Sequence, residues 1–272
     1  MRRASITAAL VGLFLMCFPT TGGAFLTVGI LFPSEGRFNS DCGYSNRLPD
    51  DPIVKPAQPG ASHSHDFFGN KTTNAFSTYD SLQAGGTTCR RTSDTAAYWV
   101  PTVYENGTAL RASSLIAYYT ARGKSALSIK PFPAGLRIVA GNASATQPQP
   151  MMVASWSCGE NMATDSATIP LCALGGLQVH IRFPDCWDGR NLDFTDHRSH
   201  MAYSTNGVCP TGYANPMPAL QINATYPSRG GPTVTLASGS SYSAHGDFFN
   251  SWNQQALASL VRDCLQLNRN CG

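Results

Sequence analysis

The amino-acid sequence predicts a mainly β protein: a β-sandwich or jelly-roll-like single domain with long loops, four disulfides and a C-terminal helix. Three observations carry this prediction. Seven short runs of β-branched and aromatic residues are each bounded by Gly, Pro or Asn. Eight cysteines follow the N-terminal segment, and only one stretch, near the C-terminus, has helical periodicity. Many short strands at this spacing are typical of sandwiches and barrels.

The N-terminal segment 1–24 has the form of a secretory signal peptide. Arg2 and Arg3 precede an apolar run to Phe18, and small residues end at Ala24. The run is too short to span a bilayer, so we expect no membrane span after cleavage. Residues 25–272 then form a single secreted β-rich domain. Loss of two arginines lowers the formal net charge from +3 to +1. Without a Lys/Arg run, the chain is not expected to bind nucleic acid.

The cysteine pattern indicates disulfides rather than a thiolate metal site. After residue 24 the count is even, and no C-x-x-C pair occurs. We expect two local pairs, Cys158–Cys172 and Cys186–Cys209. The remaining four cysteines are Cys42, Cys89, Cys264 and Cys271.

From residue 25 to residue 60 the chain is rich in Pro, Gly, Asn and Asp, which indicates turns and extended segments. The seven predicted strand runs follow this segment. Pro101 predicts an edge strand or a bulge within the first run. The runs are 97–104, 115–119, 136–140, 153–157, 177–183, 220–226 and 233–236.

One helix is expected near the C-terminus. Ser251 and Gln254 have the spacing of a capping box, which places the start of the helix at Ser251. The apolar residues that follow recur at helical spacing, so one face of the helix should dock on the sheet. They are Ala256, Leu257, Leu260, Val261 and Cys264.

The stretch 180–203 concentrates titratable groups in a chain that is only 13% charged. It holds three of the six histidines and four aspartates between two apolar segments. A polar loop held at both ends is a common way to build a site. The alternative is that these groups cap turns and solvate a long surface loop.

Histidines elsewhere suggest a metal site. His63 and His65 would project from one face of an extended segment, because side chains alternate along a strand. His245, His197 or His200 could complete the ligand set. Imidazole and carboxylate suit Zn, Cu, Fe or Mn, so one divalent metal (Zn, Cu or Mn) is the cofactor to expect. We assign His63, His65 and His245 as metal candidates. Alternatively, such histidines only pack and hydrogen-bond.

A second hypothesis is acid–base chemistry on a glycan. Glycosidic cleavage commonly needs one protonated and one ionised carboxyl group. The candidate catalytic residues are Asp66, Asp188, Asp196, His197, His200 and Asp247. Aromatic side chains beside them could stack on sugars, although each could equally pack in the core. These substrate-binding candidates are Phe67, Trp187, Tyr203 and Trp252. Lyase chemistry, with His and Tyr203 moving the protons, would use the same groups.

The remaining motifs give weaker evidence about function. Neither G-x-S-x-G nor H-E-x-x-H occurs. Gln178-Val179-His180 resembles a short strand motif of jelly-roll polysaccharide lyases. Two segments, 65–68 and 245–249, place His and Asp just before a Phe pair and could be an internal repeat or neighbouring strands. Sequons are expected to lie on the surface and carry glycans in a eukaryotic source. They begin at Asn70, Asn106, Asn142 and Asn223.

Several segments, in order, resemble one known family. They are 51–54, 62–70, 135–137, 182–189, 196–203 and 245–252. The chain resembles the secreted domain-of-unknown-function family nineteen-ninety-six, found in fungi and actinobacteria and sometimes joined to carbohydrate-binding modules. The resemblance implies no established activity, but those companion modules point to polysaccharide. Where members carry Gly-Trp-Asp near the last helix, this chain has Ser251-Trp252-Asn253.

Taken together, the sequence predicts a secreted, extracellular or cell-wall, carbohydrate-active enzyme. We expect hydrolysis of a cell-wall or extracellular polysaccharide through an Asp/His site. A non-catalytic metal-binding or glycan-binding extracellular protein is the alternative, and a structural wall protein comes third.

Overall fold

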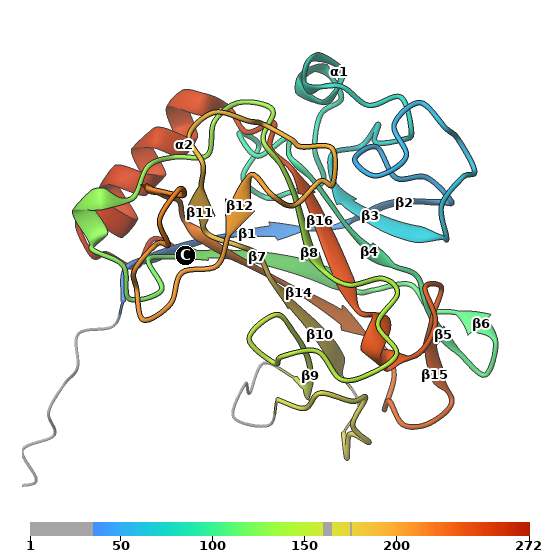
Figure 1. The fold of residues 1–272 in the computed structure, drawn as a ribbon. Helices are drawn as coiled ribbons and strands as arrows, with labels where there is room; N and C mark the ends of the chain where they lie inside the picture. The colour runs from blue at the N-terminus through green and yellow to red at the C-terminus, as the bar shows by residue number, and fades with distance from the viewer. Residues whose placement is uncertain (1–34, 160–164, 175) are drawn as a thin grey trace, which may run out of the picture. The chain divides into compact units, whose positions relative to one another are not determined.

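Two five-stranded antiparallel sheets form the framework of the chain (Figure 1). The computed structural model describes residues 35–159, 165–174 and 176–272, all within the compact unit Ser34–Gly272. The predicted signal peptide lies outside the described residues. Sheet A has the strand order β1 (Arg37–Cys42), β7 (Ser114–Thr120), β14 (Ala219–Tyr226), β10 (Leu177–Arg182) and β9 (Ala154–Cys158). Sheet B has the order β2 (Tyr44–Leu48), β3 (His65–Gly69), β4 (Ala97–Pro101), β16 (His245–Phe249) and β8 (Arg137–Gly141).

The main hydrophobic core lies between the two sheets. In β7, residues alternate between buried and half-buried, which directs Leu115, Ala117 and Tyr119 inward. Phe248 from β16 belongs to the same core cluster, and so does Phe38, which stacks on the Tyr119 ring at 4.5 Å. Burial of each such side chain contributes about 1.5–3 kcal/mol. The predicted mainly β fold is confirmed.

Sheet B is covered on its outer face as well. Phe67, Trp99 and Phe249 form a second apolar cluster with Ile53 from the loop before β3 and Leu82 from α1 (Tyr79–Ala84). Every residue of β3, β4 and β16 is therefore buried. The equally buried β4 was predicted from its Tyr, Trp and Val residues, whereas β3 and β16 contain Asp and Gly, which are depleted in strands, and were not predicted. β3 and β16 are not neighbouring strands, because β4 lies between them and pairs with both.

Pro101 was predicted to mark an edge strand or a bulge, and this is wrong because β4 is the central strand of sheet B. Pro101 is the last residue of β4, and the pairing of β4 with β16 runs only from Ala97 to Trp99. The missing N–H of the proline therefore interrupts no bond of that ladder.

The remaining strands form two small three-stranded sheets. One joins β11 (Cys186–Trp187), β12 (Met201–Ala202) and β13 (Asn215–Pro216). The other joins β5 (Val103–Glu105), β6 (Thr108–Ala109) and β15 (Val234–Leu236). Short 3-10 helices occur at Ala126–Ser128 and Ser241–Ser243.

Four disulfides hold the loops. Both predicted local pairs, Cys158–Cys172 and Cys186–Cys209, are confirmed. The other two are Cys42–Cys89 and Cys264–Cys271. Disulfides of this kind stabilise a fold by about 2–4 kcal/mol each, largely by restricting the unfolded chain.

The C-terminal helix is confirmed, but its start is not where it was predicted. Helix α2 (Gln254–Leu260) has Asn253 as its N-cap, whose side chain accepts a hydrogen bond from the Ala256 N–H at 3.0 Å. Ser251 instead donates its hydroxyl to the Thr95 carbonyl. The helix continues as the π-helix Val261–Gln266, which places Cys264 on its buried side. A bilayer requires about 20 apolar residues. Even α2 with its π-helical continuation, Gln254–Gln266, is shorter than that, and no helix among the described residues is long and apolar enough to cross a membrane.

Two of the four sequons are not on the surface, contrary to prediction. Asn70 is fully buried and donates to the carbonyls of Leu82 and Thr95. Asn223 lies within β14 and is 5% exposed. Of the four sequon asparagines, Asn106 and Asn142 are the exposed ones, which a glycan could reach in the folded protein.

A buried carboxyl group, that of Asp94, takes part in a chain of hydrogen bonds within the main core. Asp94 accepts hydrogen bonds from the Tyr98 hydroxyl at 2.9 Å and from the Ala96 N–H. The Tyr98 hydroxyl also contacts that of Tyr119, which accepts from the Trp252 indole. Burial raises the pKa of Asp94 from 3.8 to about 7.

The stability of the fold should therefore depend on pH through Asp94. The folded state keeps this proton up to about pH 7, whereas the unfolded chain releases it near 3.8. The contribution of Asp94 is complete below the unfolded pKa and is lost as pH rises to about 7, on the order of 4 kcal/mol. Urea unfolding of wild type and Asp94→Asn from pH 4 to 8 should show a shallower decline in the variant. Identical slopes would contradict this role.

Candidate metal centre

The candidate site lies on the outer face of sheet B. In the strand register His65 of β3 faces Pro101 of β4. Asp247 of β16 faces Trp99, so His245, two residues earlier, is level with Pro101 on the other side. Adjacent strands lie about 4.8 Å apart, so two imidazoles that lean inward across β4 can meet. Their Nε2 atoms are 3.3 Å apart.

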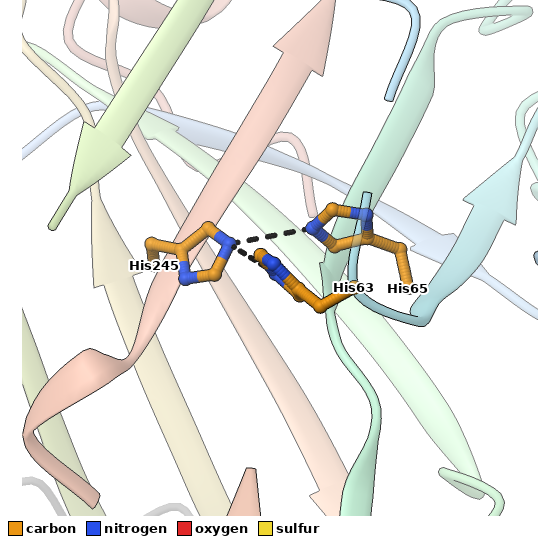
Figure 2. A group of neighbouring side chains, drawn as sticks. All are labelled: His63, His65 and His245. Atoms are coloured by element: carbon orange, nitrogen blue, oxygen red, sulfur yellow. Dashed lines mark hydrogen bonds between the residues drawn. The ribbon is translucent and has the colours of Figure 1, made fainter. Parts of the chain in front are cut away.

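A third imidazole completes the group. His63, in the segment before β3, places its Nε2 3.1 Å from the Nε2 of His245. Figure 2 shows the three rings pointing toward one another from two strands and a loop. Their ligand nitrogens all lie within 4.8 Å of one another. The structure thus brings together the three histidines that the sequence marked as metal candidates.

Backbone carbonyls fix the tautomers of two of these rings. The Nδ1 of His65 lies 2.9 Å from the Asp50 carbonyl, and the Nδ1 of His245 lies 2.7 Å from the Ser243 carbonyl. A carbonyl only accepts, so each Nδ1 carries the proton. Burial lowers the pKa of His65 well below its usual value and that of His245 to about 3. Burial also lowers the pKa of His63. The rings are therefore neutral near pH 7.

With these tautomers, a nitrogen lone pair of His65 and one of His245 face each other with no proton between them. With both Nδ1 atoms protonated, the Nε2 atoms of His65 and His245 are both acceptors at 3.3 Å, and no hydrogen bond can form between them. A His63 Nε2–H could donate to one of them only. A cation bound by all three nitrogens removes the conflict. Tetrahedral Zn²⁺ with Zn–N bonds of 2.0–2.1 Å separates its ligand nitrogens by about 3.3–3.4 Å, close to the distances found here.

The hydrogen bonds from the two rings to backbone carbonyls are also of the kind that orients metal-ligating histidines. A ligating histidine usually donates the N–H of its other ring nitrogen to a carbonyl or carboxylate, which orients the ring. Here Asp50, in the loop before β3, and Ser243, just before β16, supply those acceptors. The two rings are thus held in position by backbone.

Asp247 lies beside the histidines on the same face of sheet B. It is 1% exposed, and neither of its carboxylate oxygens has a hydrogen-bond partner among the described residues. Burial, followed by the charge of Asp51, raises its pKa well above 3.8. Asp51, His65 and Asp247 offer ligand atoms within 4.8 Å of one another.

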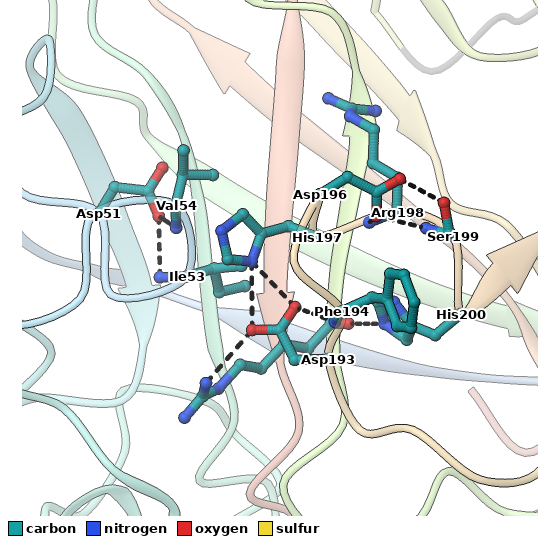
Figure 3. A network of polar contacts seen from close by, with 11 residues as sticks. Asp51, Ile53, Val54, Asp193, Phe194, Asp196, His197, Arg198, Ser199 and His200 are labelled. Carbon is teal, nitrogen blue, oxygen red and sulfur yellow. Dashed lines mark hydrogen bonds and ion pairs between the residues drawn. The ribbon is translucent and has the colours of Figure 1, made fainter.

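Sequence reasoning missed Asp51. Its Oδ1 accepts hydrogen bonds from the N–H groups of Ile53 and Val54, both at 2.9 Å (Figure 3). In sequence it is therefore indistinguishable from an ordinary turn aspartate. Its place at the start of the first segment that resembles the family was the available signal.

His63, His245, Asp51 and Asp247 line one cavity of about 350 Å³, whereas His65 is fully buried and is not part of its lining. His197 and Asp196 of the long polar loop reach its lining. A contact within its own loop orients the ring of His197, whose Nδ1 lies 2.9 Å from the Asp193 carboxylate (Figure 3). Asp196 is exposed and caps its turn, where hydrogen bonds from Ser199 and Arg198 lower its pKa. The polar lining includes Asp51, Lys55, Ser62, His63, Asn142, Ser144, Asp196, His197, Arg198, His245 and Asp247.

Three other candidate catalytic residues lie elsewhere. Asp66 is fully buried and bonded to Arg47 and Thr102. Asp188 accepts from two N–H groups of its own loop. His200 is buried and donates its Nε2–H to the Arg137 carbonyl at 2.6 Å.

The four aromatic candidates are also outside the described lining of this cavity. Phe67 and Trp252 are fully buried, so neither ring presents a face to solvent. The indole of Trp187 donates to the Asn191 carbonyl, and the Tyr203 hydroxyl donates to the Arg182 carbonyl.

Fold and site together define a disulfide-bonded β-sandwich with a histidine- and aspartate-lined pocket on the outer face of one sheet. The chain belongs to the family described as "Domain of unknown function (DUF1996)", whose model matches residues 51–252. The matched range includes all three histidines as well as Asp51 and Asp247. No curated protein and no solved structure matches the chain.

Metal binding should stabilise the folded protein. At a free Zn²⁺ concentration 100 times Kd, the gain is about 2.7 kcal/mol, which corresponds to a Tm increase of roughly 5–10 °C for a chain of this size. Differential scanning calorimetry with Zn²⁺, Cu²⁺ and Mn²⁺ would measure it.

His63→Ala and His245→Ala should abolish the shift. His197→Ala, which changes a histidine of the same cavity outside the triad, should retain it. Equal shifts in all three variants, or none in wild type with any of the ions, would contradict the assignment.

Proposed function

We propose that this protein is an extracellular, metal-dependent hydrolase that acts on polysaccharide. The observation that carries the proposal is the convergence of three Nε2 atoms beside the buried carboxyl group of Asp247. The four disulfides and the signal-like N-terminus support an extracellular location.

The arrangement suits hydrolysis because three protein ligands leave a coordination position open. His63, His65 and His245 would hold a divalent metal, which would supply a bound water of lowered pKa and polarise an oxygen of the substrate. The positive charge of such a metal would oppose the rise in the pKa of Asp247, so that its carboxylate, beside the triad, would accept the proton of the attacking water and deliver it to the leaving oxygen or nitrogen. The cavity of about 350 Å³ is large enough for one or two sugar-sized groups.

This chemistry favours hydrolysis of an ester or amide bond, in which water attacks a carbonyl carbon. Water forms the new C–O bond, the ester or amide bond breaks, and the leaving group takes the proton. Polysaccharides carry such bonds as acetyl and methyl ester substituents. Glycosidic cleavage is the second candidate, because Asp51 and Asp247 are two buried carboxyl groups in one cavity. Burial raises the pKa of Asp247 well above 3.8, whereas two backbone N–H bonds oppose the same effect at Asp51.

Activity assays can separate the two reactions. Metal-loaded protein should release acetate or methanol from acetylated xylan, chitin or pectin, and a chelator should remove the activity. Release of reducing ends without acetate or methanol would favour glycosidic cleavage. Protein that retains one equivalent of metal and yields no product on any substrate would be a non-catalytic metal-binding protein, and the proposal would be wrong.

Asp247→Asn should lower kcat by about 10²–10⁴, the range for loss of a general acid–base group. Elemental analysis of the same sample should still find metal, because the three histidines are intact. Asp263→Asn, which removes an exposed carboxylate on the C-terminal helix, is the matched control and should keep full activity. Wild-type turnover in Asp247→Asn would contradict its role.

A further inference from the structure

A second cavity lies on sheet A, on the other side of the main core from the histidines. It has a volume of about 410 Å³ and is lined by outward-facing residues of β1, β7, β10 and β14. In the register Tyr118, Gln221 and Arg182 form one row across three strands. Thr120 pairs with Ala219 in the next row. Small side chains in that second row leave a hollow between the larger residues.

The charge of this hollow favours an anion. Three arginines, Arg37, Arg122 and Arg182, and one carboxylate, Glu35, contribute to its lining. Arg182 is ion-paired with Asp165, whereas Asp185, 4.0 Å from Arg122, is bonded by Lys124. Arg37 and Arg122 therefore give the hollow its excess of positive charge over Glu35. Glu35 already accepts a hydrogen bond from the Gly123 N–H at 2.9 Å. A guanidinium group presents paired N–H donors that match the two oxygens of a carboxylate.

One of the arginines is held rigidly. The Nη1 of Arg182 donates to the Met151 carbonyl at 2.6 Å and to Ser155 at 2.9 Å, and its Nη2 donates to Asp165 at 2.7 Å. Its side chain is 11% exposed. A guanidinium fixed in this way loses little conformational entropy when a ligand binds.

Neutral polar groups and an aromatic ring complete the lining. Asn223 is 5% exposed, and its Oδ1 accepts a hydrogen bond from Gln221 at 2.8 Å, so the amide is oriented. Amide groups can bond sugar hydroxyls, and the half-buried ring of Tyr118 offers an apolar face beside them.

We propose that the hollow on sheet A binds an acidic oligosaccharide, with a uronate carboxylate on the arginines and its sugar ring beside Tyr118. This site is separate from the histidine cavity and does not depend on the proposed hydrolysis. Because the main core lies between the two, both sites can be occupied at once.

Isothermal titration calorimetry with trigalacturonate tests the site, and its fully methyl-esterified form is the matched ligand without charge. Trigalacturonate should bind, affinity should fall as salt is raised, and the ester should bind at least tenfold more weakly. Absence of binding, or equal binding of the two ligands, would overturn the proposal.

Variants locate the binding. Arg37→Gln and Arg122→Gln should each weaken trigalacturonate binding about tenfold, the equivalent of one charge-assisted hydrogen bond. Arg262→Gln removes the same charge from the exposed C-terminal helix and should bind as wild type does. His245→Ala should also bind normally, which separates this site from the metal centre. Equal losses in Arg262→Gln, or loss only in His245→Ala, would contradict the assignment.

Discussion

The contact between the Nε2 atoms of His65 and His245 is the feature on which the functional interpretation rests. Both rings are oriented by carbonyls and neutral through burial, so the two nitrogens face each other as acceptors. A folded protein rarely keeps such an arrangement in its interior without a compensating partner. Asp247, two residues along the same face, adds a second group whose oxygens have no hydrogen-bond partner in the part of the chain that the structure describes. A bound cation accounts for both.

Sheet B makes this arrangement possible. Because its outer face is covered by α1 and the loop before β3, the histidines are removed from water and their imidazoles remain unprotonated. The same loop provides the Asp50 carbonyl and the Asp51 carboxyl group. Pro101, between the two histidines in the register, ends β4 at the level where the rings meet. Sheet A keeps a polar outer face, and this difference places two distinct cavities on one sandwich.

Sequence reasoning identified strands such as Ser114–Thr120 and Ala97–Pro101, since runs of β-branched and aromatic residues are a local signal. It missed His65–Gly69 and His245–Phe249, because both contain Asp and Gly, which are depleted in strands. The His63/His65 pair was recognisable from its spacing. Asp66 could have been separated from it, because successive residues of a strand face opposite sides. The approach of His245 depends on the order of strands in sheet B, which no local pattern encodes.

Anomalous X-ray diffraction from crystals soaked in Zn²⁺ tests the central claim most directly. The account predicts a single strong peak between His63, His65 and His245, with each Nε2 about 2.0–2.1 Å from the ion. An absence of anomalous density among the three rings at full zinc occupancy elsewhere, or a zinc ion bound by other residues, would contradict it.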